Sequence, residues 1–336
     1  MKIKKVLIIR FSSFGDIVQC ASVVELISQY HPNAQIDWVT RSDFNALVGL
    51  NEKVKKTWVV NKKDGMRGLL KLAFTLRAEK YDHIYDAHNN LRSSILAILL
   101  RARLFNHPRW LVRSKDRLKR IFLFSFRINF FPKPFKGVES FCAPLRKWGI
   151  TKKTSLTVKW KFPESVVAKI DDLELPSEFI SLVPSAAWEM KRWPLDHFKK
   201  LITLMPETSF VVLGGKEDTF CEELYAIAPK RVINLAGKLS LIESCRLVEI
   251  SPLVISADTG LLHVADTLGV KGISLMGPTA FGFTYSEKIK TMEVDLECRP
   301  CTKDGRGACT QDIYQKCMVD ITPERVKRES LKLLAE

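Results

Sequence analysis

Short apolar runs alternate with stretches of helical length along almost the whole chain. The first run, Lys4–Arg10, is rich in β-branched residues, and residues 16–30 follow it with apolar positions at helical spacing. Such continuous apolar runs are typical of parallel strands buried on both faces. Further strands are predicted at residues 35–40, 56–61 and 83–86, then at 179–184, 209–214, 231–235, 253–256 and 271–276. The pattern predicts an α/β protein with two doubly wound sheets in tandem.

A charged stretch that contains prolines separates the two series of strands. Residues 151–178 have the composition of a domain linker. We therefore predict an N-terminal Rossmann-like domain at residues 1–155, a linker at 156–178 and a second Rossmann-like domain at 179–320. A terminal helix is expected at residues 321–336, with Pro323 in its first turn.

The charge is distributed unevenly between the two halves. The 336 residues include 53 Lys and Arg against 37 Asp and Glu, a net charge of +16. Residues 1–160 hold 31 basic and 11 acidic residues, whereas the remainder holds 22 basic and 26 acidic residues. The first half is therefore expected to meet an anionic partner. No apolar run approaches the roughly 20 residues of a membrane span, and none resembles a signal peptide, so a cytoplasmic protein is expected.

The first candidate site is the turn at residues 11–16, between a predicted strand and a helix. Ligands of open α/β sheets bind at this carboxyl edge. A dinucleotide fingerprint needs three spaced glycines, and this turn has only Gly15, which disfavours a nicotinamide dehydrogenase. The turn does offer the carboxylate of Asp16 beside two hydroxyls. The alternative is that Asp16 or Ser13 only caps the helix.

Three further turns carry candidate chemistry in the second half. Lys191 lies in a segment after a strand, where it can reach a phosphate, although Lys-Arg pairs are usually solvated. The Gly-Gly-Lys-Glu217 turn can receive a base or ribose, and an ordinary turn explains its glycines almost as well. Asp258 and Thr279 lie at consecutive strand ends, where helix-start amides bind anions. His263 alone is more often a helix residue than a ligand.

Five segments together resemble the lipopolysaccharide heptosyltransferases of glycosyltransferase family nine. They are RFSSFGDIV, SAAWEMKRWPLDHF, VVLGGKED, INLAGKLSLIES and SADTGLLHVADTLGVKGISLMGPT, in the order of the family and spanning nearly the whole chain. The resemblance implies a GT-B fold, with two Rossmann-like domains facing a central cleft. It also implies an inverting transfer of heptose from ADP-heptose to the lipopolysaccharide inner core without a metal ion.

The resemblance implies a role for each matching position. Asp16 matches the general base, and Lys191 matches the lysine that contacts the donor phosphates. Glu217 matches the residue that holds the ribose, Leu239 the residue that packs on adenine, and Asp258 the residue that binds the sugar hydroxyls. The remaining donor-binding positions are Ser185, Ala186, Gly214, Gly215, Thr259, Gly260, His263, Gly277 and Thr279.

Residues 101–136 mix cations with aromatic side chains. They include 11 basic residues, one acid, seven Phe and one Trp. This composition suits docking to an anionic membrane surface, and the alternative is a helix packed on its own domain through phenylalanines. We expect a monomer associated peripherally with the inner face of the cytoplasmic membrane, without a nucleic-acid partner. The expected acceptor-binding residues are Ser12, Ser13, Arg92, Lys115, Arg117 and Arg120.

Four cysteines near the C-terminus have a spacing that can hold structural zinc. Cys298, Cys301, Cys309 and Cys317 form C-x2-C-x7-C-x7-C. Disulfides are disfavoured in a cytosolic protein. A similar segment in heptosyltransferase-like relatives is not the catalytic centre. A zinc site is therefore not favoured. We expect no cofactor, with ADP-heptose as a substrate.

Three alternative functions stay open. The Thr-Ala-Phe-Gly-Phe sequence from Thr279 departs from the more polar continuation of relatives, so the donor can be another nucleotide sugar. The basic first half also suits nucleic-acid binding, but neither a zinc-finger spacing nor an RNA-binding aromatic motif is present. A non-catalytic nucleotide-sugar binder is the third alternative, and it predicts that Asp16 is dispensable.

Overall fold

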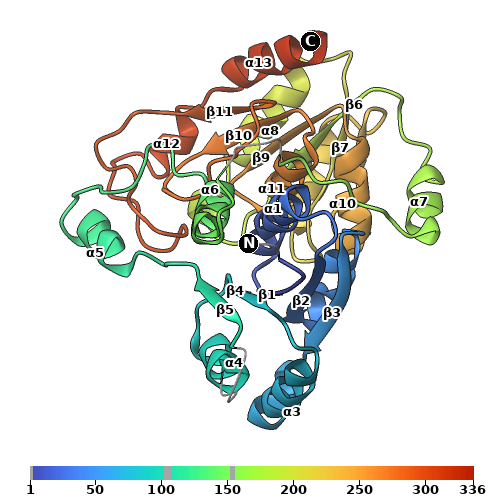
Figure 1. The fold of residues 1–336 in the computed structure, drawn as a ribbon. Helices are drawn as coiled ribbons and strands as arrows, with labels where there is room; N and C mark the ends of the chain where they lie inside the picture. Colours follow the sequence, from blue (N-terminus) through green and yellow to red (C-terminus); the bar gives the residue numbers. More distant parts are fainter. Residues whose placement is uncertain (1–2, 102–106, 152–155) are drawn as a thin grey trace. The chain divides into compact units, whose positions relative to one another are not determined.

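The computed structural model describes residues 3–101, 107–151 and 156–336, and it contains two compact units (Figure 1). The first unit comprises residues 1–116 and 138–161, and the second comprises residues 117–137 and 162–336. Each unit is built on one parallel sheet. The α/β class and the two Rossmann-like units predicted from the sequence are therefore confirmed.

The first sheet has the order β3-β2-β1-β4-β5, with all neighbours parallel. The order reverses between β1 and β4, which defines the switch point of a doubly wound sheet. The strands are β1 Lys5–Ile9, β2 Gln35–Arg41, β3 Val54–Val60, β4 His83–Asp86 and β5 Arg109–Val112. The α-helices are α1 Phe14–Tyr30, α2 Asn45–Gly49, α3 Gly65–Ala78, α4 Leu91–Arg101 and α6 Gly137–Cys142.

Both faces of this first sheet are covered, which explains the continuous apolar strands. Leu7 and Ile9 of β1 belong to a buried cluster with Leu76 of α3 and Leu96 of α4. Ile8, whose side chain points to the opposite face of the sheet because neighbouring residues of a strand alternate, is also fully buried. Burying a large aliphatic side chain contributes roughly 1.5–3 kcal/mol, so this double coverage fixes the sheet.

The second sheet has the order β11-β10-β9-β6-β7-β8, again entirely parallel. Its switch point lies between β6 and β9. The strands are β6 Phe179–Val183, β7 Ser209–Val212, β8 Val232–Asn234, β9 Leu253–Ala257, β10 Gly272–Met276 and β11 Ile289–Glu293. The α-helices are α7 Glu164–Asp171, α8 Leu195–Leu204, α9 Glu222–Ile227, α10 Leu241–Ile250, α11 Gly260–Leu268, α12 Lys316–Val319 and α13 Pro323–Ala335.

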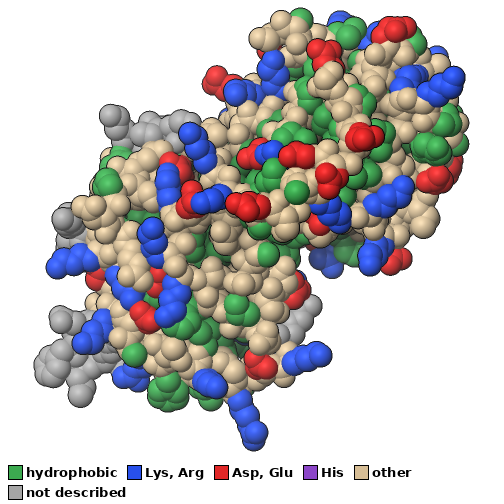
Figure 2. Space-filling model, turned by 90° about the vertical axis from the view of Figure 1, so that its right-hand side faces the viewer, with side chains coloured by type: hydrophobic (Ala, Val, Ile, Leu, Met, Phe, Trp, Pro, Cys, Tyr) green, Lys and Arg blue, Asp and Glu red, His purple; other side chains and the backbone are tan. Residues whose placement is uncertain are grey.

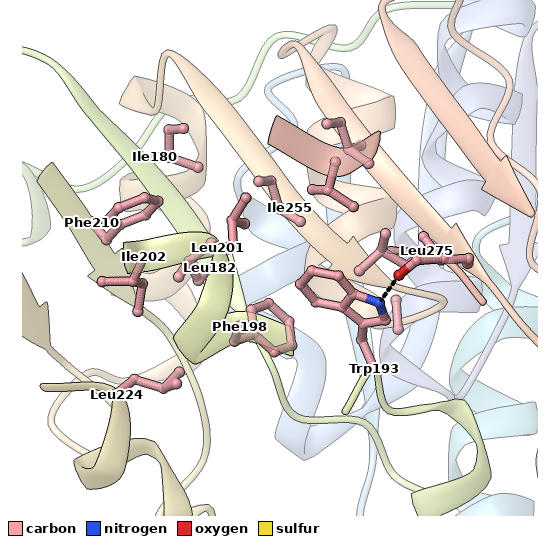
Figure 3. Close-up of a cluster of buried hydrophobic side chains, with 14 of the residues drawn as sticks. Ile180, Leu182, Trp193, Phe198, Leu201, Ile202, Phe210, Leu224, Ile255 and Leu275 are labelled. Carbon is pink, nitrogen blue, oxygen red and sulfur yellow. Dashed lines mark hydrogen bonds between the residues drawn. The ribbon is translucent and has the colours of Figure 1, made fainter. Parts of the chain in front are cut away.

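The core of the second unit joins the strands to α8 and α13. Figure 3 shows part of this core, including Trp193, whose indole N–H donates a hydrogen bond of 2.8 Å to the carbonyl of Ile321. Phe198 packs edge-on against the Trp193 ring, with centroids 4.7 Å apart. The predicted terminal helix is present as α13, and it is part of this core rather than an appendage.

A segment from the middle of the first predicted domain belongs to the second unit. Residues 117–137 contain α5 Arg117–Ser125, and three of their phenylalanines surround Phe281 at centroid distances of 6.1, 5.1 and 5.0 Å. The three are Phe124, Phe131 and Phe135. The division at residue 155 is thus corrected, because the packing of these three rings on Phe281 draws the segment into the second unit.

The predicted linker, residues 156–178, also has structure of its own. Its first part pairs with the first unit, where the Lys161 N–H donates to the Leu50 carbonyl at 2.8 Å. Helix α7 follows and packs on α10 of the second unit. Within the described residues, every helix is too short or too polar to cross a bilayer. Lys and Arg side chains are spread over the face shown in Figure 2, with acidic and hydrophobic side chains between them.

Candidate active site

Each unit places polar side chains at the carboxyl end of its sheet, beside the switch point. In the first unit, the turn after β1 leads to Asp16, and β4 ends at Asp86. In the second unit, Lys191 follows β6 and Asp258 follows β9. Ligands of doubly wound sheets bind at this position. The fold therefore brings the predicted turns to the two places where such proteins bind their substrates.

Asp16 takes part in the helix cap and also keeps an accessible carboxylate. Ser13 is the N-cap of α1, and Asp16 accepts hydrogen bonds from the Ser13 hydroxyl at 2.7 Å and from its N–H at 3.4 Å. The side chain of Asp16 is nevertheless 36% exposed, and its Oδ2 lies 2.5 Å from Nη2 of Arg10. Asp16 thus caps the helix and still presents a carboxylate to solvent.

The charge on Asp16 is controlled by Arg10, the residue directly after β1. Burial raises the pKa of Asp16, but the Arg10 guanidinium and the Ser13 hydroxyl outweigh burial and hold the pKa below its ordinary value. Arg10 is itself buried and donates to the Ala87 carbonyl at 2.8 Å, so it cannot turn away. Asp16 is therefore ionised at neutral pH, as a group that accepts a proton must be.

The end of β4 adds a second, more buried carboxylate. Oδ1 of Asp86 accepts hydrogen bonds from the N–H groups of His88 at 2.9 Å and Asn89 at 2.8 Å. Burial raises the pKa of Asp86, and burial lowers the pKa of His88 to about 4. Asp86 therefore shapes the turn after β4, and His88 is neutral near physiological pH.

The second unit holds Asp258 in a closed set of contacts. Nζ of Lys191 lies 2.7 Å from Oδ2 of Asp258, and the Thr279 hydroxyl donates to the same oxygen at 3.2 Å. Nε2 of His263 lies 3.4 Å from Oδ1. Burial raises the pKa of Asp258, but Lys191 and His263 oppose it and leave the pKa well below its ordinary value. The structure thus joins four predicted donor-binding residues through direct contacts.

The helix that follows Asp258 begins with amide groups directed at the same edge. Thr259 caps α11, since its hydroxyl oxygen accepts from the Leu262 N–H at 3.4 Å and contacts the Ser256 hydroxyl at 2.9 Å. Gly260 is the first residue of α11. The N-terminus of a helix attracts anions through its free N–H groups and its dipole. A phosphate near Lys191 would meet positive potential from both sources.

The turn after β7 is organised by a neighbour of the predicted ribose ligand. Oδ2 of Asp218 accepts the Gly215 N–H at 2.6 Å, and a Cβ at Gly214 would lie 3.1 Å from that oxygen. Glu217 is exposed beside it, and Leu239 is half-buried before α10. Asp218 thus fixes the backbone and leaves Glu217 free to point outward. The roles of Glu217 and Leu239 stay predictions.

Two glycines for which the sequence predicted no role in donor binding pack directly against Lys191 and Asp258. A Cβ at Gly282 would lie 2.1 Å from Cγ of Asp258, and a Cβ at Gly305 would lie 2.6 Å from Cγ of Lys191. Gly305 also has φ +93°, which favours glycine. Gly282 lies in the Phe-Gly-Phe sequence that departs from the relatives, and Gly305 lies between two of the four cysteines. These two unusual sequences were the signal that could have pointed to the glycines.

The cysteine-rich segment holds the turn before Thr279 in place through Arg299. Arg299 donates to the carbonyls of Gly277 at 2.7 Å and Met276 at 3.1 Å, so it fixes the turn before Thr279. The four cysteines are free thiols, and burial raises the pKa of Cys317 to about 11. In the part of the chain that the structure describes, no group of three or more His, Cys, Asp or Glu is placed to hold a metal. Zinc in this segment stays untested.

The predicted acceptor-binding residues are divided between the units. Ser12, Ser13, Arg92 and Lys115 belong to the first unit, whereas Arg117 and Arg120 belong to the second. The guanidinium of Arg120 stacks 4.4 Å from the centroid of Phe281, and Arg92 is exposed at the start of α4. The contacts within each unit do not join these residues into one cluster, so their roles stay predictions.

Comparison with known proteins identifies the family. The model of glycosyltransferase family 9 (heptosyltransferase) matches residues 69–309. The chain belongs to glycosyltransferase family 9. This match confirms the family and the enzyme class, a glycosyltransferase, that were predicted from the sequence. It spans both the first-unit strand β4 and the whole Lys191–Asp258 site.

Individual relatives of this family 9 protein agree with the assignment. The chain is 28% identical over 192 residues to lipooligosaccharide heptosyltransferase 2 of Campylobacter jejuni, a match that spans 54% of the chain but only 58% of that relative. It is 26% identical to lipooligosaccharide heptosyltransferase 2 of Haemophilus influenzae, over 98% of the chain and 99% of the relative. The structure of ADP-heptose lipopolysaccharide heptosyltransferase II of Escherichia coli matches with a TM-score of 0.73, 22% identity and 98% of each chain covered. That structural likeness confirms the GT-B fold.

Proposed function

We propose that this family 9 protein is an inverting, metal-independent heptosyltransferase that uses ADP-heptose as donor. The acceptor is the inner core of lipopolysaccharide, either Kdo-lipid A or heptosyl-Kdo-lipid A. The observation that carries the proposal is the contact set of Lys191, Asp258, His263 and Thr279 at the switch point of the second sheet. The matched Escherichia coli enzyme is named for ADP-heptose, and this supports the choice of donor.

The second unit supplies the groups that a nucleotide-sugar donor needs. The departing ADP gains negative charge, which Lys191 and the N–H groups at the start of α11 stabilise without a metal ion. The ionised Asp258 accepts hydrogen bonds from the hydroxyls of the transferred sugar. Glu217 holds the ribose and Leu239 packs on the adenine. The diphosphate lies along the small residues Ser185, Ala186, Gly214, Gly215 and Gly277.

The first unit supplies the base. In a single displacement, the acceptor hydroxyl loses its proton as the new bond to the anomeric carbon forms and the bond to ADP breaks. The carboxylate of Asp16, ionised and partly exposed, takes that proton. Because attack occurs opposite the leaving group, the configuration of the anomeric carbon inverts. Arg10 holds the carboxylate in place and keeps it charged between turnovers.

The segment at residues 117–137 is proposed to rest on the inner face of the cytoplasmic membrane. It carries six basic residues and no acid. Its large exposed hydrophobic side chains are Leu118, Ile121, Phe122, Phe126, Ile128 and Phe130. The ring of Phe122 contacts those of Phe126 and Phe130, with centroids 5.8 and 5.4 Å apart. Cations beside exposed aromatic side chains favour an anionic lipid surface, where the lipid-linked acceptor resides.

Transfer to defined acceptors tests the proposed reaction. Purified protein is incubated with ADP-heptose and either Kdo-lipid A or heptosyl-Kdo-lipid A, and the products are weighed by mass spectrometry. We expect the mass of one heptose to be added to one acceptor, and the gain to be lost in Asp16→Ala. Measurable ADP binding without transfer to either acceptor would indicate another nucleotide sugar. Transfer that survives Asp16→Ala would exclude Asp16 as the base.

Vesicle sedimentation tests the membrane contact separately. Phe126→Glu should lower the bound fraction on vesicles containing phosphatidylglycerol severalfold, since a charge replaces an inserted ring. Phe74→Glu is the matched control, because Phe74 is equally exposed, at 65% against 62%, but lies on α3 outside the segment. Equal binding of both variants and the unmodified protein would contradict this role of the segment.

A further inference from the structure

Arg113 lies at the same sheet edge of the first unit as Asp16, and the proposed mechanism gives it no role. It directly follows β5, and its N–H donates to the carbonyl of Asp86, the last residue of β4, at 2.9 Å. The side-chain amide of Asn89 donates to the Arg113 carbonyl, also at 2.9 Å. The backbone of Arg113 is therefore fixed beside the turn that follows β4, where ligands of such sheets bind.

The side chain of Arg113 is held in one orientation by helix α6. Nε and Nη2 both donate to the hydroxyl of Ser140, at 3.2 and 3.0 Å. The guanidinium carbon lies 3.8 Å from the centroid of the Phe141 ring, a cation–π contact. Phe141 is fully buried, and its carbonyl accepts a hydrogen bond of 2.7 Å from the hydroxyl of Tyr85 in β4. The guanidinium is thus anchored to the sheet through α6.

One edge of this guanidinium stays available to a ligand. Ser140 occupies the edge between Nε and Nη2. Nη1 has no hydrogen-bond partner among the residues that the structure describes, and it keeps contact with solvent. In the same part of the chain, no Asp or Glu forms an ion pair with Arg113. The edge between Nη1 and Nη2 presents parallel N–H donors, which match two oxygens of a carboxylate or phosphate.

Arg113 is a half-buried cation next to an ion pair that is already complete. Arg10 approaches the same Phe141 ring, with its guanidinium carbon 5.4 Å from the centroid, and pairs with Asp16 at 2.5 Å. Burial lowers the pKa of Arg113, because a charged group loses stability when it leaves water. An anion that binds the guanidinium offsets this loss. Since Asp16 is committed to Arg10, a bound ligand is the available source of that anion.

The turn beside Asp16 also lies in a positive electrostatic field. Burial lowers the pKa of His88 to about 4, and the charges of Arg10 and Lys115 act in the same direction. The His88 ring lies 5.1 Å from the ring of Phe11, in the turn that leads to Asp16. The carboxylate of Asp16 alone would repel an anionic substrate, and the neighbouring cations offset that repulsion.

We propose that Arg113 binds an anionic group of the acceptor saccharide, a carboxylate or a phosphate, and thereby places the attacking hydroxyl at Asp16. The proposal rests on the proposed function, which makes the acceptor a lipid-linked saccharide that carries such groups. The free edge of the guanidinium donates two hydrogen bonds to the anion, and Asp16 takes the proton of the hydroxyl. Arg113 binds substrate without taking part in the proton transfer.

Acceptor kinetics test this role. Arg113→Gln should raise the KM for the acceptor about 10- to 100-fold, the range expected for hydrogen bonds to a charged group. The KM for ADP-heptose and kcat at saturating acceptor should stay within twofold, because Arg10 still keeps Asp16 ionised. Arg113→Lys keeps the charge but not the paired donors, so its KM should lie between the two. Arg109→Gln is the matched control, since Arg109 is exposed at the opposite end of β5.

Modified acceptors identify the anion. Methyl esterification neutralises the carboxylates of the acceptor, and dephosphorylation removes its phosphates. One of these two changes should raise the KM of the unmodified protein as much as Arg113→Gln does, and Arg113→Gln should be insensitive to the same change. Sensitivity to esterification assigns the contact to a carboxylate, and sensitivity to dephosphorylation assigns it to a phosphate. If Arg113→Gln responds to both changes as strongly as the unmodified protein does, the proposal is wrong.

Direct binding separates failure of this inference from failure of the proposed function. Saturation-transfer NMR measures contact between the protein and the delipidated acceptor saccharide in the absence of donor. Weaker binding in Arg113→Gln and Arg113→Lys, but not in Arg109→Gln, supports the subsite even if no heptose is transferred. Unchanged binding in both Arg113 variants would overturn the inference, and normal heptose transfer in the same samples would leave the proposed function intact.

Discussion

The two units hold their key carboxylates in different ways. Asp16 and Asp258 both follow a strand at the switch point, and each pairs with a cation, Arg10 or Lys191. Asp16 is 36% exposed and its bonds come from its own helix cap and the preceding strand. Asp258 is 16% exposed and is bonded by residues from three separate segments. The first carboxylate is open on one side, and the second is enclosed.

This difference fits the different roles proposed for the two carboxylates. A general base must take a proton from a substrate hydroxyl. A carboxylate that is partly exposed and fixed by protein contacts on its other side is suited to this task. A group that orients a sugar must not move, and contacts from several elements fix Asp258 in place. The lowered pKa of both groups keeps both ionised, so position rather than charge distinguishes the roles proposed for them.

Of all the variants, Asp16→Asn is expected to have the largest effect on catalytic rate. The amide can still accept the helix-cap hydrogen bonds but cannot take a proton. Since general base catalysis typically contributes 10²–10⁴-fold, kcat should fall by about that factor. ADP binding, measured by calorimetry, should stay within twofold. A loss of ADP affinity comparable to the loss of kcat would show that Asp16 is not confined to the acceptor step.

Lys191→Met should lower both the affinity for ADP and the free energy of unfolding. It removes the charge expected at the phosphates and leaves Asp258 enclosed without its cation. We expect about 100-fold weaker ADP binding and a loss of about 2 kcal/mol in unfolding free energy, below the 3–5 kcal/mol of fully buried pairs because both side chains are slightly exposed.

Lys199→Met is the control for this variant. Lys199 pairs with Glu223 at the same 2.7 Å, but on an exposed surface, where such pairs contribute little. Denaturant titration should show a much smaller loss of stability for the control than for Lys191→Met. If both variants lose equal stability, the enclosed pair has no special role.

Gly305→Ala tests whether the cysteine-rich segment positions Lys191. The added Cβ would lie 2.6 Å from Cγ of Lys191 and should displace its ammonium group, with about tenfold weaker ADP binding. Gly307→Ala is the matched control, because Gly307 also has a positive φ, +116°, while its Cβ would meet nothing closer than 4.0 Å. Backbone strain is common to both variants, so only the difference between them reports on Lys191.

The smallest effect is a pH dependence of stability. The pKa of Asp258 is lowered by folding, so its stabilisation is present above the ordinary value of 3.8 and is lost as the pH falls through and below that value. The unfolding free energy of the unmodified protein should therefore approach that of Asp258→Asn between pH 6 and pH 3. The difference should shrink by about 1 kcal/mol. A constant difference would show that Lys191 and His263 do not depress this pKa.

The sequence predicted the repeating strands and the residues at their ends because both depend on local patterns. Lys191 and Asp258 were found this way, although they are 67 positions apart. The strands β5 and β11 were missed, since β5 has only three apolar residues after Arg109 and Lys290 interrupts the apolar positions of β11. The contact of Gly305 with Lys191 and the aromatic cluster around Phe281 depend on chain crossings between distant segments, which no local pattern encodes.

The chain order of the two units has a consequence during protein synthesis. Residues 117–137 leave the ribosome long before Phe281, against which Phe124, Phe131 and Phe135 pack. At translation rates of 5–20 residues per second, these three rings wait roughly 7–30 s for their partner. During that time they are exposed on the nascent chain, and the first unit must close around an unfinished loop. A chaperone that binds aromatic segments therefore has a defined period in which to act on this protein.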